Sequence, residues 1–539
     1  MSGAGGGGGG SGDQLLDEQL AALLNSEDEA TAAAALMSAA AAGFGGSAAA
    51  AAAYSTSGVV GGAGYLVRRV SLTDLFNNCV RTALQQGLVF TLPIFIMCIL
   101  FKVLCHTVGE GFEETGISFL PRQIIHVSSG CLGLVILHHL FQEFTMLVLL
   151  QGLLAYITIL LAHTFLSRRC GLATALLSLI FHLICQVYLP ADSWQKIRGP
   201  LMVLSLKVVS IGFDLDRQLL LLVPGVFEFF GYAFNVGTVV FGPWVAFLDY
   251  MTIIQIKDRP MNFSWLLTAI RAYVLSIGSL LYSTCFSNWI IIDGSYKWLI
   301  AFRDAQSFRF SHYFTCYTSE ATAIASGIGA SRYREAGNSE TKWDLRVCKP
   351  LNVELPRSLV DVVTNWNLPM HRWLKQYVFN QSLHYGKFPA VLLTYIASSL
   401  LHGMNFQLSA VLLSIGVYSY IEYVLRQRLA SIFNLCIESR PCSSAGGGGE
   451  GGSGQASNGS SAHQCMEHPG RQIAGRRLSN LLFTCLAIFH LSYLGLLFDT
   501  SPISEQGYSY QHTLSKWAEL DYLSHLVAGA SFAFYMLIR

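Results

Sequence analysis

Charged residues are scarce in this sequence. Asp, Glu, Lys and Arg together make up 12% of the 539 residues, about half of the ~25% that is usual in soluble domains. Lys plus Arg number 34 and Asp plus Glu number 33, so no excess of positive charge favours a nucleic-acid partner. Because 52% of the residues are hydrophobic, a water-soluble protein of this composition would expose large apolar patches. The composition therefore predicts a membrane protein that lies in a lipid bilayer.

The first 65 residues lack a basic segment followed by an apolar core, so they are not predicted to be a signal peptide. Residues 1–12 are mostly glycine and residues 32–53 mostly alanine. Such low complexity predicts a disordered tail over residues 1–65, followed by one membrane-embedded domain over residues 66–539. Inside that domain, a Gly/Ser-rich stretch at about 443–462 predicts a flexible loop.

The 13 cysteines show no spacing that indicates a disulfide framework. Cysteine in an apolar run usually packs as a small hydrophobic side chain. Three such cysteines are Cys98, Cys185 and Cys285. A group of possible zinc ligands lies in or beside the Gly/Ser-rich stretch, but its spacing is irregular for a zinc site. This group consists of Cys442, His463, Cys465 and His468. No metal site is therefore expected.

Long apolar runs recur along the rest of the chain. A membrane helix needs about 17–25 apolar residues, and about eleven membrane segments are predicted, some of them re-entrant. They are Gly87–Cys105, Ile124–Leu140, Phe144–Phe165, Cys170–Leu189, Leu201–Phe213 (too short to span alone), Val226–Met251, Trp265–Ile291, Phe308–Ala330, a pair within Phe388–Ile421, Leu478–Phe498 and Tyr522–Ile538. Helices satisfy their own backbone in lipid, whereas barrel strands would alternate. The predicted fold class is all-α, a polytopic helical bundle.

The run Phe388–Ile421 contains no Asp, Glu, Lys or Arg. It is too long for one span and slightly short for two, so we expect two short spans with a recessed turn near Gly403. Ser331–Tyr377 holds eight Lys/Arg and five Asp/Glu, and Leu425–Arg477 holds six Arg and three Glu. Both flanking segments are net basic and are predicted to be cytosolic. The turn would place His402 beside a cavity.

An ionisable residue at membrane depth is costly and is usually retained for function. His402 is such a residue, and Asn367 lies 35 residues upstream in an amphipathic stretch. A histidine within the membrane with a side-chain amide nearby suggests a general base. Other histidines in or beside apolar runs are interpreted as packing or hydrogen-bonded bundle residues. These are His138, His139, His163, His182, His312 and His490.

Two pieces of sequence carry a resemblance to a known family. Trp366-Asn367, followed by an apolar run into Leu401-His402-Gly403, resembles the membrane-bound O-acyltransferase superfamily, as does Phe241-Gly242-Pro243-Trp244 with Asp249-Tyr250. Further segments are similar to the branch of that superfamily that acylates Wnt proteins. They are Val208–Arg217, Lys349–Ser358, Glu422–Arg426, Leu486–Leu491 and Glu505–Tyr508. The resemblance covers about residues 75–539. The branch that acylates Hedgehog proteins has Asp in place of Asn367.

The resemblance implies a helical bundle with an internal tunnel in the endoplasmic reticulum membrane. It implies palmitoleoyl-CoA as the acyl donor, taken from the cytosolic side, and a serine of a Wnt protein as the acceptor, entering from the lumen. No permanently bound cofactor is implied. His402 would be the general base, Asn367 would orient a reacting group or donate to an oxyanion, and Trp366, Leu401 and Gly403 would contact substrate. Without a G-x-S-x-G motif, direct transfer is expected rather than an acyl-enzyme.

Two other functions remain open. The first is an acyltransferase of the same superfamily that acts on another protein or on a small lipid alcohol, because the catalytic pair does not define the acceptor. The second is a transporter without chemistry. Transporters often contain internal repeats with broken helices in matching halves, and this sequence shows no such repeat.

Overall fold

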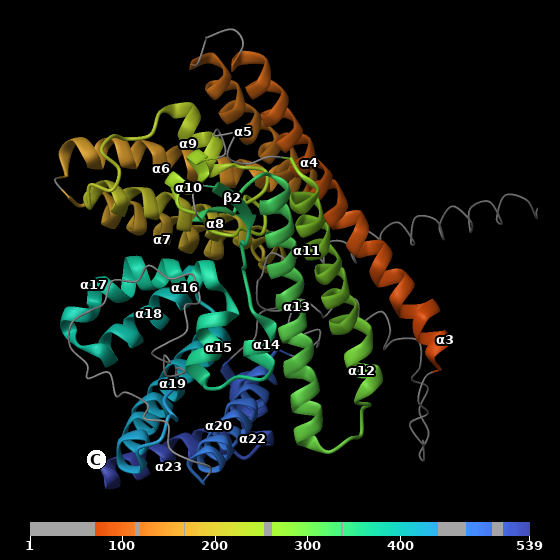
Figure 1. The fold of residues 1–539 in the computed structure, drawn as a ribbon, viewed down its shortest axis with the longest axis vertical. Helices are drawn as coiled ribbons and strands as arrows, with labels where there is room; N and C mark the ends of the chain where they lie inside the picture. The colour runs from red at the N-terminus through yellow and green to blue at the C-terminus, as the bar shows by residue number, and fades with distance from the viewer. Residues whose placement is uncertain are drawn as a thin grey trace, which may run out of the picture.

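The computed structural model describes residues 71–113, 119–166, 168–252, 261–335, 338–439, 471–498 and 510–539. Within these ranges the chain is helical apart from loops and one antiparallel hairpin, formed by β1 (Ala330–Glu335) and β2 (Asn338–Trp343). The predicted all-α fold is therefore confirmed (Figure 1). The predicted N-terminal tail and the stretch at about 443–462 lie outside the described residues.

The first half of the chain forms one group of helices. In order these are α3 (Leu72–Leu75), the π-helix η1 (Phe76–Val80), α4 (Arg81–Glu113), α5 (Phe119–Phe141), α6 (Thr145–Phe165), α7 (Cys170–Tyr188), α8 (Ala191–Asp216), α9 (Val226–Ala233) and α10 (Phe247–Met251). Next come α11 (Phe263–Leu281), the π-helix η5 (Tyr282–Phe286), α12 (Ser287–Ile290) and α13 (Lys297–Ala325). Helices α11 and α13 lie side by side along the molecule (Figure 1).

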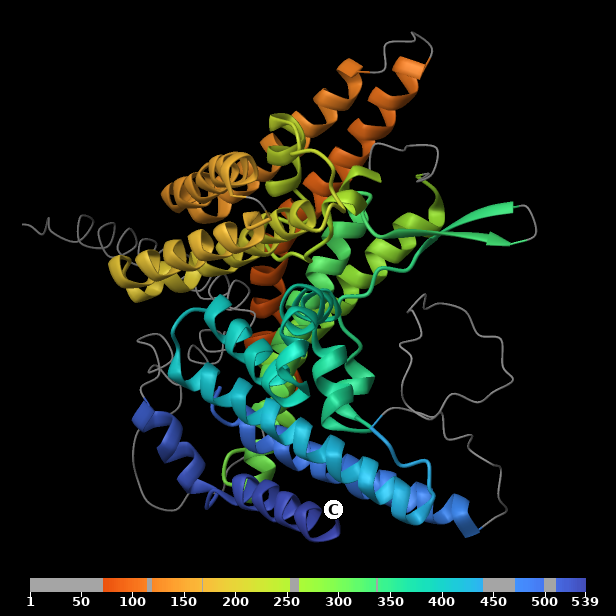
Figure 2. The same cartoon turned by 90° about the vertical axis from the view of Figure 1, so that its left-hand side faces the viewer.

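The second half begins with short helices. These are α14 (Pro350–Glu354), α15 (Leu359–Trp366), α16 (Leu368–Leu374), the π-helix η6 (Lys375–Phe379), α17 (Asn380–Ser382) and α18 (Lys387–Leu401). Longer helices follow: α19 (Phe406–Phe433), α20 (Arg471–Gly495), α22 (Tyr510–Glu519) and α23 (Leu523–Ile538). Figure 2 shows α19 and α20 crossing the end of the molecule opposite α5 and α6, while the β-hairpin projects from one side.

Six helical segments of the described chain are long and apolar enough to cross a membrane. They are Leu72–Val108, Arg122–Phe165, Cys170–Tyr188, Phe263–Ile290, Phe406–Phe433 and Ala474–Gly495. The pair α22 and α23, bent by 77°, makes a possible seventh. The prediction of a multi-pass membrane protein is confirmed, but the count of eleven is not. Part of the difference is that Arg122–Phe165 contains two predicted segments, separated by a short 3₁₀ turn at Gln142–Phe144.

The apolar stretch Val226–Met251 is not one helix, because α9 ends at Ala233 and α10 begins only at Phe247. A buried polar cluster ends α9. The Nζ atom of Lys207 donates to the backbone carbonyls of Tyr232 and Ala233, at 3.0 and 3.2 Å, and so satisfies acceptors at the helix end. The resulting loop brings residues 240–244 toward the centre of the molecule. Hydropathy alone did not show this break.

Two weaker predicted segments lie inside long buried helices. Leu201–Phe213, which is too short to span alone, is the middle of α8, and most of its residues are buried. Phe308–Ala330 overlaps α13, whose charged side chains find partners: Arg309 pairs with Glu354 and Arg346 with Glu320. Both helices are largely buried, and the ion pairs of α13 explain how a charged helix can be buried.

The interpretation of Cys285 as a packed free thiol is wrong. Cys79 of η1 and Cys285 of η5 form a disulfide across a sequence separation of 206 residues. Cys98 and Cys185 are buried free thiols, as expected. An apolar run looks the same around a packed cysteine and a bridged one, so only the packing of η1 against η5 revealed the pairing.

Candidate active site

A cavity of about 420 Å³ lies where α8, α13, α15, α16, α18, α19 and α20 meet. Three predicted site residues line it together: His402, Asn367 and Trp366. Leu401 and Gly403 are not among its lining residues in the described chain. Leu401 packs against the main hydrophobic core, and Gly403 is buried next to Gln186 and Trp194. The structure thus brings three of the five predicted residues into one chamber.

Much of the cavity wall is apolar. Side chains of α8, of the loop that follows α9, and of α19 and α20 supply this part. They include Met202, Val203, Leu206, Val240, Trp244, Leu412, Ile415, Leu491 and Leu494. Polar side chains gather elsewhere on the wall, among them His371 and Lys375 of the α16–η6 segment. A cavity of this size with an apolar section and a few polar groups is typical of a ligand-binding site.

The turn that carries His402 lies between α18 and α19. His402 is the C-cap residue of α18, and its N–H donates to the carbonyl of Ser399 at 3.2 Å. Gly403 follows with φ +88°, a left-handed conformation that glycine adopts without cost. Asn405 then caps α19, since its side chain accepts from the N–H of Leu408 at 3.1 Å. The predicted turn near Gly403 and the predicted cavity beside His402 are confirmed, but the predicted pair of spans is not, because α18 has 15 residues and only α19 is long and apolar enough to cross a membrane.

Asn367 separates α15 from α16. Its backbone is extended, with φ −147° and ψ 97°, and its Oδ1 atom accepts from the N–H of Met370 at 3.0 Å. This N-cap fixes which end of the amide is the oxygen. The Nδ2 atom has no hydrogen-bond partner within the described ranges. Because Asn367 lines the cavity, its amide nitrogen is placed to donate to a group bound there.

His312 of α13 belongs to the same chamber, although it was interpreted as a bundle residue. Its ring stacks on the indole of Trp366, with centroids 4.2 Å apart and planes inclined by 6°. Its Nε2 atom lies 3.1 Å from the backbone carbonyl of Trp366, which can only accept, so Nε2 is the donor. His312 thereby supports the residue that precedes Asn367. The sequence spacing around His312 offered no signal of this contact.

Backbone hydrogen bonds hold the Trp366–Asn367 turn on both sides. The N–H of Leu368 donates to the carbonyl of Val347 at 2.8 Å, and the N–H of Lys349 donates to the carbonyl of Asn365 at 3.0 Å. The strand-like segment that provides these bonds is fixed in turn by Glu320. The fully buried Glu320 accepts from the N–H of Val347 at 3.1 Å and from Arg346 at 2.6 Å. Helix α13 therefore anchors the turn through Glu320.

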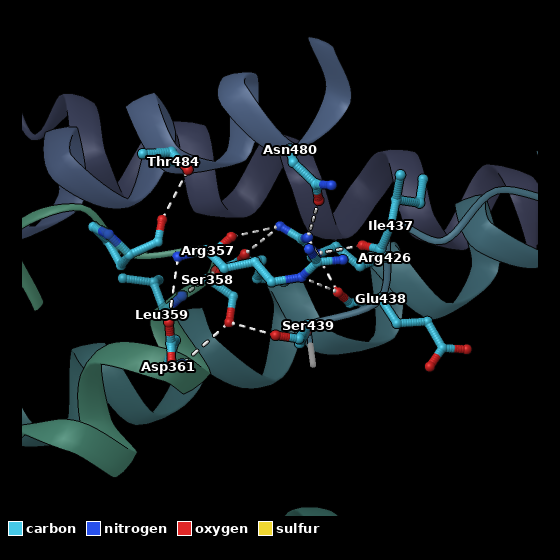
Figure 3. Close-up of polar contacts among 12 residues, drawn as sticks. Arg357, Ser358, Leu359, Asp361, Arg426, Ile437, Glu438, Ser439, Asn480 and Thr484 are labelled. Carbon is cyan, nitrogen blue, oxygen red and sulfur yellow. Dashed lines mark hydrogen bonds and ion pairs between the residues drawn. The ribbon is translucent and has the colours of Figure 1, made fainter. Parts of the chain in front are cut away.

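The start of α15 is held by α19 (Figure 3). Glu422 accepts from the N–H of Leu359 at 2.8 Å, and Arg426 donates to the carbonyl of Arg357 at 2.9 Å. Arg426 is fully buried and also donates to the carbonyls of Ile437 and Glu438 and to Oδ1 of Asn480 on α20. Two of the segments that carried the family resemblance, 349–358 and 422–426, thus meet in one network.

The same region is tied to α13 by a second ion pair. Arg309 donates two hydrogen bonds to the carboxylate of Glu354, each at 2.8 Å, and the hydroxyl of Tyr313 donates to it as well. Burial opposes ionisation of Glu354, but these hydrogen bonds hold the pKa of its carboxyl below the usual value. Glu354 therefore stays charged and keeps α14 fixed on α13.

Beyond Asn367, helix α8 fixes the far end of the segment. The hydroxyl of Tyr377 donates to Asp214 at 2.9 Å, and Arg217 donates to the carbonyl of Gln376 at 2.7 Å. Asp216 instead accepts from the N–H groups of Cys170 and Gly171 and so caps α7. The charged residues of the segment 208–217 therefore have structural roles: Asp214 and Arg217 hold the segment that follows Asn367, and Asp216 holds the start of α7.

No group of three or more His, Cys, Asp or Glu side chains within the described ranges could hold a metal ion. The four possible zinc ligands noted in the sequence, Cys442, His463, Cys465 and His468, lie outside those ranges.

Comparison with known proteins identifies the family. Residues 169–436 match the family model for MBOAT, the membrane-bound O-acyltransferase family. The protein-serine O-palmitoleoyltransferase porcupine of Mus musculus is 39% identical over 494 residues, which cover 87% of this chain and 99% of the relative. The chain belongs to the membrane-bound O-acyltransferase family. The resemblance found in the sequence is thereby confirmed, and His312, Asn367 and His402 all fall within the matched region.

Other members of the family are more distant. The protein-serine O-palmitoleoyltransferase porcupine of Drosophila melanogaster is 31% identical over 501 residues, which cover 89% of this chain and 90% of the relative. Lysophospholipid acyltransferase 1 of Arabidopsis thaliana is 26% identical over 280 residues, 44% of this chain and 60% of the relative. The palmitoleoyltransferases therefore resemble this chain nearly end to end, whereas the plant enzyme resembles less than half of it.

Proposed function

We propose that this protein transfers a palmitoleoyl group from palmitoleoyl-CoA to a serine hydroxyl of a Wnt protein, in the endoplasmic reticulum membrane. The near full-length similarity to protein-serine O-palmitoleoyltransferases supports this donor and acceptor. The observation that carries the mechanism is that His402 and Asn367, 35 residues apart in the sequence, line one cavity. The reaction needs no permanently bound cofactor, since donor and acceptor supply all the reacting atoms.

In this mechanism His402 is the general base. Its imidazole takes the proton from the serine hydroxyl as the serine oxygen attacks the thioester carbonyl carbon. The tetrahedral intermediate then collapses, the carbon–sulfur bond breaks, and the proton passes from the imidazolium to the departing CoA thiolate. A positioned base of this kind contributes about 10²–10⁴-fold to the rate. The sum of the steps is an oxygen ester and free CoA.

In this mechanism Asn367 stabilises the negative charge that develops on the thioester carbonyl oxygen. Because its Oδ1 atom is engaged by the N–H of Met370, its Nδ2 hydrogens are the end of the amide that faces a reacting group. Donation to the developing oxyanion stabilises the intermediate, and such a donor contributes about 10²–10³-fold. His312, stacked on Trp366, holds the preceding residue and so keeps this amide in place.

The apolar part of the cavity accommodates the acyl chain. Each buried CH₂ group contributes about 0.8 kcal/mol, so a long chain binds tightly to a wall such as that formed by Val203, Leu206 and Leu412. Binding of the chain also excludes water, which limits hydrolysis of the thioester.

A second acceptor class has a specific observation in its favour. Lysophospholipid acyltransferase 1 of Arabidopsis thaliana matches 44% of this chain, and the hydroxyl of a lysophospholipid would react with the same base. The longer match to the palmitoleoyltransferases favours a protein serine.

The product formed from labelled palmitoleoyl-CoA distinguishes these acceptors. Purified protein in detergent or nanodiscs is incubated with the donor and with either a Wnt hairpin peptide that contains the acceptor serine or a lysophospholipid. A Ser→Ala peptide is the matched control. Palmitoleoylation of the serine peptide alone is expected. Labelled phospholipid with no labelled peptide would replace the proposal by the second acceptor class, and release of no CoA with either acceptor would contradict acyl transfer.

A further inference from the structure

Helix α7 reaches the His402 turn through one side chain. Gln186, near the C-terminal end of α7, donates from Nε2 to the carbonyl of Met404 at 2.9 Å. Its Oε1 atom accepts from the N–H of the same residue at 2.8 Å. The two groups are 218 residues apart in the sequence. The N–H and the C=O of Met404 belong to successive peptide groups, so the two hydrogen bonds hold both peptide groups that flank this residue against one side chain.

The turn lies closely against this part of α7 and the start of α8. A Cβ atom at Gly403 would lie 3.0 Å from Oε1 of Gln186 and 3.2 Å from Cζ2 of Trp194. Trp194 is itself buried and meets the ring of His182 edge to face, with centroids 6.0 Å apart. Only a residue without a side chain lets the peptide after His402 approach this close to Gln186. The contact is therefore part of how the turn is built.

We propose that Gln186 is a positioning residue for His402, which it holds in reacting orientation by binding the backbone N–H and carbonyl of Met404, two residues further on. The proposal rests on the role of His402 as the general base. These two bonds tie the turn between α18 and α19 to α7, and a displacement of about 1 Å at a reacting group can cost about 10²-fold in rate. A neutral amide does this without adding a charge to surroundings that already include Arg198, His312 and His182.

Substitution of Gln186 tests the clamp. Gln186→Met keeps the length of the side chain and removes both hydrogen bonds, whereas Gln186→Glu keeps an acceptor for the N–H of Met404 and loses the donor. The rate of acyl transfer is measured per molecule that binds palmitoleoyl-CoA, which removes any effect of folded yield. We expect a loss of about tenfold or more in kcat for Gln186→Met, a loss of kcat also for Gln186→Glu, because a carboxylate oxygen then faces the Met404 carbonyl, and an unchanged Kd for palmitoleoyl-CoA.

A matched control is Gln427→Met. Gln427 is an exposed glutamine of α19, and it donates to the hydroxyl of Tyr423 within the same helix. Its loss is expected to leave kcat and Kd unchanged. The proposal would be overturned if Gln186→Met had the wild-type kcat. It would also be overturned if the variant only bound palmitoleoyl-CoA more weakly, with a raised Kd and no change in kcat. If Gln186→Met does not fold, Gln186→Glu is decisive by the same two criteria.

His402→Ala in the same series tests the role of His402 as general base separately from the role of Gln186. Turnover by His402→Ala at the wild-type rate would remove the general base and the clamp together. An inactive His402→Ala beside a fully active Gln186→Met would remove the clamp alone.

Discussion

At the residue scale, both proposed reacting side chains stand at helix ends. His402 is the C-cap residue of α18 and Asn367 the N-cap residue of α16. A side chain at a helix end is not confined to the lateral face of the helix, and it can reach a chamber that lies between several helices. Asn367 combines two features, since its oxygen caps α16 and the residue lines the cavity.

His402→Ala is expected to reduce acyl transfer by about 10²–10⁴-fold, because the base acts in the chemical step. Expression and palmitoleoyl-CoA binding should remain near normal, since backbone hydrogen bonds of Gly403 and Met404 hold the turn. The measurement is turnover of labelled donor with a Wnt peptide, together with donor binding. Near-normal turnover would show that the mechanism is wrong.

Asn367→Ala is expected to lower kcat by at least an order of magnitude, because it removes an oxyanion donor. It also removes the cap on α16, which costs about 1 kcal/mol of stability. Asn367→Ser separates these effects, since serine caps a helix as well as asparagine does but lacks the amide donor. If Asn367→Ser restores both thermal stability and kcat, the residue is a cap and no more.

At the scale of elements, the segment from Asp344 to Tyr377 is short, irregular and held from outside. Helix α13 holds it through Glu320 and Arg309, α8 through Asp214, and α19 through Glu422 with Arg426. Each of these contacts is a hydrogen bond or ion pair to a helix distant in sequence. A segment without long helices of its own thus obtains a defined geometry at Asn367 from the rigid helices around it.

The hydrogen bonds of Arg426 are expected to stabilise the fold around the start of α15. Arg426→Met removes a fully buried guanidinium that bonds Glu422 and three backbone carbonyls. It leaves a buried carboxylate uncompensated, and loss of one partner of a buried pair costs about 3–5 kcal/mol. We expect a large drop in the unfolding temperature of the detergent-solubilised protein and in the yield of active enzyme.

The comparison variant is Arg428→Met, which loses one hydrogen bond to the carbonyl of Ile538. It should shift the unfolding temperature much less. Equal unfolding temperatures for Arg426→Met and the wild type would mean that the network does not hold α15 in place.

At the scale of the whole molecule, one large hydrophobic core runs through the helices of the first half and reaches Trp373 and Tyr377 of the second. A separate, smaller cluster joins α19, α20, α22 and α23. The cavity lies between these two groups of side chains, because its wall takes residues from α8 on one side and from α19 and α20 on the other. The chamber is therefore a product of how the two halves of the chain pack.

Removal of residues 1–65, or of residues 443–461, is expected to leave acyl transfer per folded molecule unchanged. Both stretches are rich in Gly, Ala or Ser and poor in large apolar side chains, so they have little to contribute to a packed core. The measurement is turnover in isolated membranes divided by the amount of folded protein for each deletion. A large loss in that ratio would mean that the deleted stretch contributes to the site.

The sequence by itself determined that the protein lies in a membrane, that it is helical, and that the chain turns at Gly403 with His402 beside a cavity. These conclusions depend on local properties, namely the hydropathy of a run, its length and the conformational freedom of glycine. The family was also readable, because the Trp366-Asn367 and Leu401–Gly403 segments are contiguous motifs.

Only the tertiary structure decided which distant side chains meet. His312 lies beside Trp366 across 54 residues, Gln186 beside Met404 across 218, and Cys79 is joined to Cys285 across 206. The apolar stretch before Met251 also proved to be broken, because Lys207 from another helix satisfies the end of α9. Each of these contacts depends on how helices pack against one another, and the hydropathy of a sequence does not determine that packing. An apolar helix face shows only that the face will be buried. Which element it packs against depends on complementary shape and on the hydrogen bonds that buried polar groups require.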